Sequence, residues 1–336
     1  MPPMDAINRR ELLRMTAALA PAFAGGRSLS AAGFGGPSDA EGFGRQAAPE
    51  NPGNTLRFFP GFKAARVKTS GAEINVVHAG SGPPLLLMHG APQSHVSMRL
   101  IAPELAKDYT VIVPDLRGYG DSSKPADGEN HINYSKRAMA LDQVEVMKSF
   151  GFDKFAVVGH DRGGRVGHRM ALDHADKVTR LAVFDIIPTH YLYTHVTIDF
   201  IQSYFHWFNN VRLAPGPEND IKAQNEAQKA RATNEVQIEY LRTSSQPENI
   251  HAMCEDYRAG ASIDLKHDEA DLSKKIACPV LTLWGLKGPM GRIYDVLAIW
   301  KERGVTVTGK GLPGGHNLQE DVPAEVLAEL RPFLKG

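Results

Sequence analysis

From Arg57 to the C-terminus, short apolar runs alternate with longer segments in which apolar positions recur with a helical period. Four runs without polar alternation predict strands that are buried on both faces, as in a parallel sheet, at 84–88, 110–114, 155–158 and 181–184. Later strands are predicted at 280–284 and 305–308, and a hairpin at 65–69 and 73–79. Helical spacing predicts helices at 96–105, 135–150, 162–174, 293–303 and 322–334. This alternation predicts a doubly wound, mostly parallel α/β sheet, which binds ligands at the carboxyl ends of its strands.

Residues 190–272 interrupt this rhythm. They are rich in Tyr, His, Asn, Gln and Glu, carry helical spacing such as that at 221–240, and include no strand-like run. The sheet pattern resumes at Cys278, so an inserted helical cap over the strand ends is favoured over a separate domain. We therefore expect a core at 55–189, a cap at 190–272 and the rest of the core at 273–336.

Residues 1–54 have a different character. The arginine pair Arg9-Arg10 precedes an Ala-rich stretch and a small-x-small site, Ala22-Phe23-Ala24, in the order of a twin-arginine export signal. The following residues, rich in Gly, Ala, Ser and Pro, are typical of a flexible linker. The segment predicts a periplasmic or secreted protein. A disordered basic N-terminus on a cytoplasmic protein is the alternative.

Composition narrows the range of partners. The 336 residues, 42% hydrophobic and 23% charged, suit a globular enzyme with one large core. A formal net charge of +0 gives no excess for binding nucleic acid or an anionic membrane, and no apolar run is long enough to span a bilayer. We expect a small-molecule substrate, no cofactor and no metal; a homodimer is compatible with the sequence. Cys254 and Cys278 are too few for a disulfide framework, which favours two free thiols over a single bridge.

The most informative motif is Gly159-His160-Asp161-Arg162-Gly163-Gly164-Arg165. It lies between a buried strand and a helix, which is the context of a nucleophile elbow, where small residues flank one strained reactive side chain. The usual occupant is serine, and here it is Asp161. A carboxylate that displaces a leaving group from saturated carbon becomes an ester, which activated water can hydrolyse. The elbow therefore predicts dehalogenation or epoxide opening and makes esterase or peptidase chemistry improbable.

Further motifs complete a family resemblance. These are His89-Gly90-Ala91-Pro92, then 115–122 (DLRGYGDS) after the next strand, and Leu312-Pro313-Gly314-Gly315-His316 near the end. Residues 57–336 resemble the α/β-hydrolase fold, in its aspartate-nucleophile branch of dehalogenases and epoxide hydrolases. Within that branch the haloacetate (fluoroacetate) dehalogenases are most similar.

The resemblance assigns a catalytic triad. Asp161 is the expected nucleophile and His316 the general base, since a histidine takes a proton from water at neutral pH. The acid usually follows the strand at 279–284, but no carboxylate is found there, and Asp295 lies too far along the next helix. Asp185, directly after the strand at 181–184, supplies it at the location seen in the dehalogenases and would orient His316.

Two arginines indicate the chemical class of the substrate. Arg162 and Arg165 are three positions apart on one helix, so they share a face. In a water-poor site they would bind an anion, and a small carboxylate accepts a bidentate fork from arginine. The backbone N–H groups of Ala91 and Arg162 are the expected oxyanion hole. The opposing interpretation is that both arginines pair with protein carboxylates.

The resemblance also implies a halide site in the cap. His206, Trp207 and Tyr257 match the three residues that hold halide in the fluoroacetate enzymes, where N–H and O–H donors must meet the developing charge. One position departs from the family, because Ala91 stands where phenylalanine is common. The pocket wall loses a ring, so a bulkier 2-haloacid would fit.

The leading hypothesis is hydrolytic dehalogenation of haloacetates. An epoxide hydrolase is the alternative; it needs two cap tyrosines, and Tyr257 with Tyr191, Tyr193, Tyr204 or Tyr240 would supply them, but Arg162 and Arg165 would then have no role. A ligand-binding relative without catalysis is a third class, which the complete triad disfavours.

Overall fold

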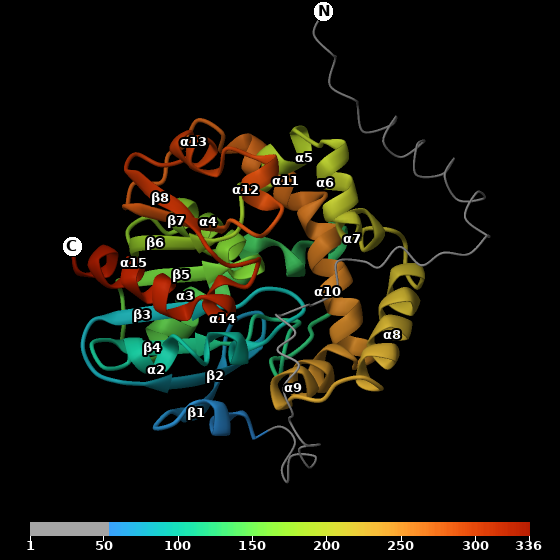
Figure 1. Cartoon of the computed structure of the whole chain (residues 1–336), viewed down its shortest axis with the longest axis horizontal. Helices are drawn as coiled ribbons and strands as arrows, with labels where there is room; N and C mark the ends of the chain where they lie inside the picture. The colour runs from blue at the N-terminus through green and yellow to red at the C-terminus, as the bar shows by residue number, and fades with distance from the viewer. Residues whose placement is uncertain (1–53) are drawn as a thin grey trace, which may run out of the picture. The chain divides into compact units, whose positions relative to one another are not determined.

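The computed structural model describes residues 54–336, so the export signal expected near the N-terminus lies outside the described residues. An eight-stranded sheet runs through the core in the order β1-β2-β4-β3-β5-β6-β7-β8 (Figure 1). The strands are β1 (Lys63–Lys68), β2 (Glu73–Ala79), β3 (Pro84–Met88), β4 (Thr110–Pro114), β5 (Phe155–His160), β6 (Val178–Phe184), β7 (Val280–Gly285) and β8 (Val307–Leu312). β1 and β2 form an antiparallel hairpin, β2 is antiparallel to β4, and all other pairs are parallel. The predicted mostly parallel α/β sheet is confirmed.

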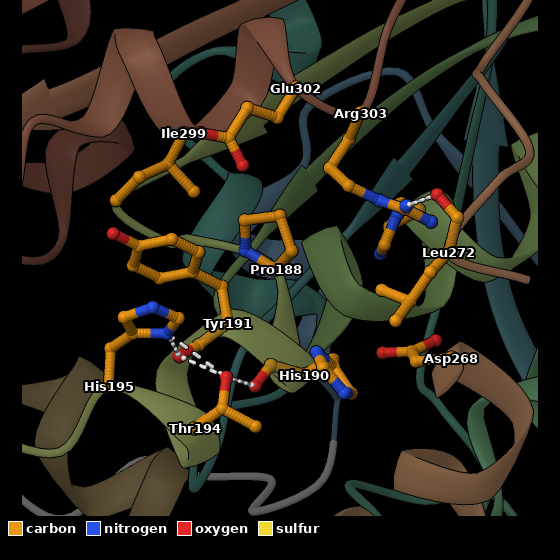
Figure 2. A pocket seen from close by; sticks show the side chains of 11 residues that line it. Pro188, His190, Tyr191, Thr194, His195, Asp268, Leu272, Ile299, Glu302 and Arg303 are labelled. Atoms are coloured by element: carbon orange, nitrogen blue, oxygen red, sulfur yellow. Dashed lines mark hydrogen bonds between the residues drawn. The ribbon is translucent and has the colours of Figure 1, made fainter. Parts of the chain in front are cut away.

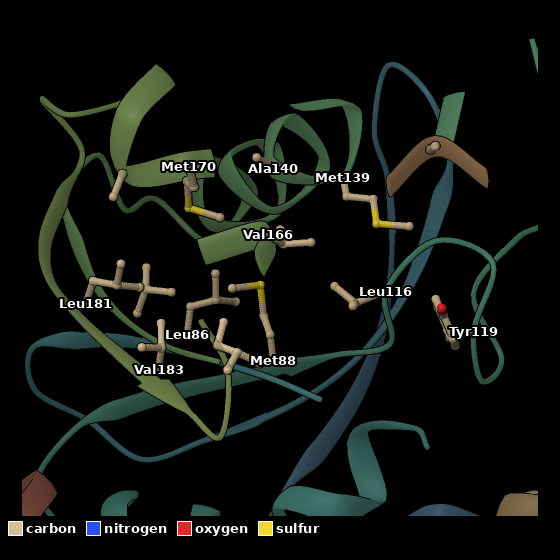
Figure 3. Close-up of a cluster of buried hydrophobic side chains, with 14 of the residues drawn as sticks. Leu86, Met88, Leu116, Tyr119, Met139, Ala140, Val166, Met170, Leu181 and Val183 are labelled. Carbon is tan, nitrogen blue, oxygen red and sulfur yellow. The ribbon is translucent and has the colours of Figure 1, made fainter. Parts of the chain in front are cut away.

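The central strands are apolar on both faces because helices cover both faces. Alternate residues point to opposite sides of a strand, so Leu86 and Met88 of β3 face one layer while Leu85 and Leu87 face the other. The first layer includes Val166 and other side chains of the covering helices (Figure 3). Each fully buried leucine stabilises the fold by roughly 1.5–3 kcal/mol relative to an exposed one. A run without polar alternation therefore fits these strands.

The helices of the core agree with the predicted pattern in position and differ in continuity. They are η1 (Thr55–Phe58), η2 (His95–Met98), α2 (Ala102–Leu105), η3 (Glu129–Tyr134), α3 (Lys136–Ser149), α4 (Arg162–Asp173), α12 (Met290–Ile293), α13 (Val296–Lys301), α14 (Leu318–Asp321) and α15 (Pro323–Lys335). The helix expected at 96–105 is two short ones, because Pro103 has no N–H for a continuous helix and lies instead in the first turn of α2. The helix expected at 293–303 is also divided, since the Asp295 side chain accepts a hydrogen bond from the Ala298 N–H and begins α13.

A set of helices follows β6 and precedes β7. They are α5 (Thr189–Thr194), α6 (Ile198–Ser203), α7 (Phe205–Asn209), α8 (Gly216–Lys229), α9 (Glu235–Ser244), α10 (Pro247–Gly260) and α11 (Ile263–Ala270). They stand together at the right of Figure 1, at one end of the strands. The helix expected at 221–240 is two helices, because the Asn234 side chain accepts from the Gln237 N–H and caps α9.

The strand predicted at 305–308 begins at Val307 and continues to Leu312. Val305 is 70% exposed and lies before the strand, where its N–H donates to the Ile276 carbonyl at 3.0 Å. Both cysteines are free, which confirms the two thiols and excludes the alternative single bridge.

No described helix combines the length and apolarity needed to cross a membrane.

The contact between α4 and β3 fixes where the elbow lies. A Cβ at Gly163 would come within 2.5 Å of the Met88 carbonyl oxygen and 2.6 Å of the His89 carbonyl oxygen, both on the backbone. The same glycine donates its N–H to the His89 carbonyl at 2.9 Å. The helix can approach the end of β3 this closely only without a side chain.

We predict that Gly163→Ala lowers the free energy of unfolding by about 1–3 kcal/mol, the usual cost of overpacking a rigid core. Urea unfolding followed by circular dichroism measures it. Gly216→Ala is the matched control, because that helical glycine has only side-chain atoms at 3.8 Å or more around an added Cβ. Equal stability of the two variants would contradict this account of the elbow.

Candidate active site

Asp161 occupies the sharp turn between β5 and α4. Its backbone is left-handed, with φ 45° and ψ −113°, a conformation that a non-glycine residue adopts only when its surroundings impose it. Gly159 before it and Gly163 after it pack against each other, since a Cβ on Gly159 would lie 2.5 Å from backbone atoms of Gly163. The turn holds Asp161 at the carboxyl end of β5, as the elbow motif predicts.

The Asp161 carboxylate is buried, at 7% exposure, and one oxygen is already bound. The Ala91 N–H donates to Oδ1 at 3.0 Å. Burial by itself raises a carboxyl pKa, but the charges of His316, Arg162, His160 and Arg165 together hold the pKa of Asp161 well below its usual range. Asp161 is therefore an anion at neutral pH.

Asp185 and His316 form the predicted pair. His316 Nδ1 lies 2.6 Å from Asp185 Oδ2, and the other oxygen of Asp185 accepts from the Gly285 N–H at 2.9 Å. Asp185 also has a left-handed backbone, with φ 52°, directly after β6. The structure thus brings together the acid and the base that follow β6 and β8, although 131 residues separate them.

The proton affinity of His316 depends on both carboxylates. Burial by itself would lower the pKa, but the hydrogen bond and charge of Asp185, with the charge of Asp161, raise the pKa of His316 above its ordinary value. A raised pKa means that the proton stays on the ring to higher pH. The base role predicted for His316 needs the neutral ring and is therefore lost as pH falls through this pKa.

Arg162 is the most unusual group near the nucleophile. Its side chain is fully buried, and none of its three guanidinium nitrogens has a hydrogen-bond partner among residues 54–336. Asp256 Oδ2 lies 3.6 Å from Nε, which is an ion pair but too long for a hydrogen bond. The Tyr257 ring lies 3.6 Å from the guanidinium carbon and the Trp207 ring 4.7 Å. Buried donors without partners are costly, so this arrangement favours an anionic ligand.

Arg165 lies beside Arg162, but one of its nitrogens already donates hydrogen bonds to other residues of the protein. Its Nη1 donates to the Ile187 carbonyl at 3.0 Å and to Thr189 Oγ1 at 2.9 Å, while its Nε is buried without a partner in the described chain. The guanidinium carbon lies 4.5 Å from the Trp207 ring. Burial and the Arg162 cation lower the pKa of Arg165 to about 10, so both arginines carry charge at neutral pH. The alternative that both are neutralised by protein carboxylates is wrong for Arg165, whose hydrogen bonds go to neutral oxygens.

The three predicted halide residues lie close together but differ in burial. Trp207 and Tyr257 are buried, with ring centroids 5.6 Å apart and edge to face. The His206 ring is 5.8 Å from Tyr257, but this residue stays exposed to solvent on α7. Burial is the main cause that raises the pKa of Tyr257 to about 12, so its hydroxyl remains a donor.

The Arg162 amide, predicted as the second oxyanion donor, is the first of helix α4, where an N–H has no partner within the helix. The Ala91 N–H already contacts the Asp161 carboxylate. The two amides belong to the two segments that meet at the Gly163 contact.

Sequence analysis missed a buried network behind Arg162. Tyr119 donates its hydroxyl to Asp256 Oδ2 at 2.6 Å, and Lys136 donates to Asp256 Oδ1. Asp256 thus has two other partners besides Arg162. The three residues come from distant segments, and no local pattern in the sequence connects them. Tyr193 and Tyr204 were considered only for epoxide chemistry; their hydroxyls are buried without partners among the described residues.

A pocket of about 370 Å³ lies apart from these residues, between α5, α11 and α13 (Figure 2). His190, Asp268 and Arg303 are among its lining residues. None of the predicted triad, arginine or halide residues lines it, whereas Tyr191, one of the candidate tyrosines for epoxide chemistry, does.

Comparison with known proteins agrees with the observed fold. The model of the alpha/beta hydrolase fold family matches residues 83–323. The chain belongs to the alpha/beta hydrolase fold family. Among members of this family, a fluoroacetate dehalogenase from Burkholderia sp is 43% identical, over 82% of this chain and 95% of its own length.

Other alpha/beta hydrolases are also similar. A soluble epoxide hydrolase from Corynebacterium sp. (strain C12) is 33% identical, over 77% of this chain and 92% of its own. A crystal structure of an alpha/beta hydrolase from Nostoc sp PCC 7120 superposes with a TM-score of 0.80 at 51% identity, covering 82% of this chain and 99% of that one. This chain is thus an alpha/beta hydrolase whose relatives include both enzyme types considered above.

We predict that the pKa of His316 lies above its ordinary value in the resting enzyme and falls in Asp161→Asn, which removes one nearby anion but keeps the side-chain shape. Imidazole NMR signals followed across pH measure both values. An unchanged or higher pKa in the variant would contradict the electrostatic coupling of Asp161 and His316.

Proposed function

We propose that this alpha/beta hydrolase is a hydrolytic dehalogenase of short haloacids, converting fluoroacetate or chloroacetate to glycolate and halide. The observation that carries the proposal is Arg162: a fully buried guanidinium beside the nucleophile whose nitrogens lack hydrogen-bond partners among residues 54–336. The fluoroacetate dehalogenase relative supports the same substrate class.

The substrate carboxylate binds first. Arg162 offers uncommitted donors, and Arg165 adds a buried Nε and a second positive charge. A bidentate contact fixes the position of the carbon that carries the halogen. Both guanidinium groups stack on the Trp207 ring, which limits their freedom to turn away. The two cations thus orient the substrate toward Asp161.

Displacement follows. An oxygen of Asp161 forms a bond to the substrate carbon while the carbon–halogen bond breaks, and the halide leaves with the bonding electron pair. The hydroxyl of Tyr257 and the indole N–H of Trp207, two buried residues whose rings meet edge to face, are the donors for the departing charge, with His206 at the exposed side. The product of this step is a carboxymethyl ester of Asp161, in which the attacking oxygen is bonded to the former halogen-bearing carbon.

Water then cleaves the ester. Once Asp161 is esterified it carries no charge, and the loss of this anion lowers the pKa of His316, so the ring becomes a base at the stage that needs one. His316 takes a proton from water, and the resulting hydroxide adds to the ester carbonyl. The Ala91 and Arg162 N–H groups stabilise the oxyanion. Collapse breaks the bond to the glycolate oxygen, which takes the proton from His316, and Asp161 returns to the carboxylate by losing one proton to solvent.

Epoxide hydrolysis is the second candidate. Tyr193 and Tyr204 have buried hydroxyls without partners in the described chain, and the Corynebacterium relative is an epoxide hydrolase. Together with Tyr257 they could protonate an epoxide oxygen. This candidate ranks second because an uncharged epoxide leaves the donors of Arg162 without an acceptor.

We predict that Arg162→Leu and Arg165→Leu each lower kcat/KM for chloroacetate. The loss of transition-state stabilisation should be about 2–4 kcal/mol for each variant, since each removes a charge-assisted contact from a dry site. Wild-type enzyme should be nearly inactive on chloroacetamide, which keeps the shape and halogen but lacks the anion. Halide release measures all rates.

Arg137→Leu is the matched control, because Arg137 is half exposed and pairs with Asp173 away from the elbow. It should keep wild-type kinetics. Equal rates on chloroacetate and chloroacetamide, or styrene oxide turnover that survives both arginine changes, would favour the epoxide hydrolase instead.

A further inference from the structure

A second cluster of ligating side chains joins the loop before η3 to the cap helix α10. Asp127, His251 and Glu255 each offer one ligand atom, and the three atoms lie within 4.8 Å of one another. His251 Nε2 is 3.0 Å from Asp127 Oδ1. None of these residues belongs to the triad, the arginine pair or the halide residues. We propose that Asp127, His251 and Glu255 bind a divalent transition-metal ion of the zinc class.

The ligand types and their spacing suit such an ion. Zinc binds imidazole nitrogen and carboxylate oxygen at about 2.0–2.2 Å, which separates neighbouring ligand atoms of a tetrahedral site by about 3.4 Å. His251 and Glu255 are four positions apart on α10, so they project from one helix face. Asp127 approaches the same point from the core. Small side-chain movements bring the three atoms to the required separation.

Neighbouring groups support these ligands as an outer shell does in metal sites. Glu218 Oε1 lies 3.3 Å from His251 Nδ1, which leaves Nε2 as the ligand atom. The other oxygen, Glu218 Oε2, is buried with no hydrogen-bond partner among residues 54–336. His131 Nδ1 lies 2.6 Å from Glu255 Oε2 and adds a second imidazole at the site.

The backbone at His131 is consistent with a built site. Asn130 and His131 both have left-handed conformations, with φ 53° and φ 64°. Two consecutive non-glycine residues in this region are unfavourable unless contacts hold them. Here the turn directs the His131 ring to Glu255.

The charge balance also favours a cation. Three carboxylates, those of Asp127, Glu218 and Glu255, meet one guanidinium, that of Arg258, which pairs with Glu218 and with Glu255 at 2.8 Å each. With neutral histidines the cluster keeps two formal negative charges. A divalent ion would neutralise them, and it would link α10, which also carries Tyr257, to the core loop.

The test uses untagged protein freed of metal by a chelator and then titrated with zinc chloride. We expect one zinc ion per chain by elemental analysis. At a free zinc concentration about a hundredfold above Kd, the thermal midpoint should rise by roughly 5 °C. His251→Ala and Asp127→Asn should each weaken binding at least tenfold. Both side chains are more than two-fifths exposed, so neither variant is expected to unfold.

His195→Ala is the matched control, since His195 is an exposed histidine outside the cluster and its loss should leave zinc binding unchanged. Absence of zinc binding by the wild-type chain would overturn the proposal. Binding that persists unaltered in both cluster variants would overturn it as well, because the ion would then lie elsewhere.

Discussion

The close approach of α4 to the end of β3 is the constraint on which the active site depends. Because no side chain separates Gly163 from the Met88 and His89 carbonyls, the helix begins directly beside the turn that carries Ala91. Asp161 is then forced into a left-handed conformation, and the Ala91 N–H reaches its carboxylate. One packing contact between backbones thus positions the proposed nucleophile, the proposed oxyanion donors and Arg162.

The buried charges around the elbow determine the ionisation state of each group in the site. Asp161 lies among cations that keep it ionised, while Arg162 is held from behind by Asp256 at a distance too long to satisfy its donors. Such a group is costly unless a ligand completes it. The same coupling raises the pKa of His316 while Asp161 is charged. In the proposed mechanism this pKa falls when Asp161 becomes an ester. Binding and base activation follow from one set of charges.

Local patterns in the sequence correctly predicted those features that neighbouring residues determine. The strands β3 to β7 and the elbow follow from apolar runs and the small residues around Asp161, whereas the Asp185–His316 pair was expected from the family resemblance. The divided helices depend on single residues, Pro103, Asn234 and Asp295, whose effects outweigh the helical period around them. The Tyr119–Lys136–Asp256 network and the cluster around His251 could not be predicted, because their members meet only after the cap packs on the core.

The most direct test of the central claim, that Asp161 attacks carbon, is a single turnover in oxygen-18 water with enzyme in excess over chloroacetate. The account predicts that the new hydroxyl oxygen of glycolate is light, because it comes from the Asp161 carboxylate, and that the peptide containing Asp161 gains the heavy oxygen. Heavy oxygen in the first-turnover glycolate, with an unlabelled Asp161 peptide, would mean that water attacks the substrate directly and would contradict the account.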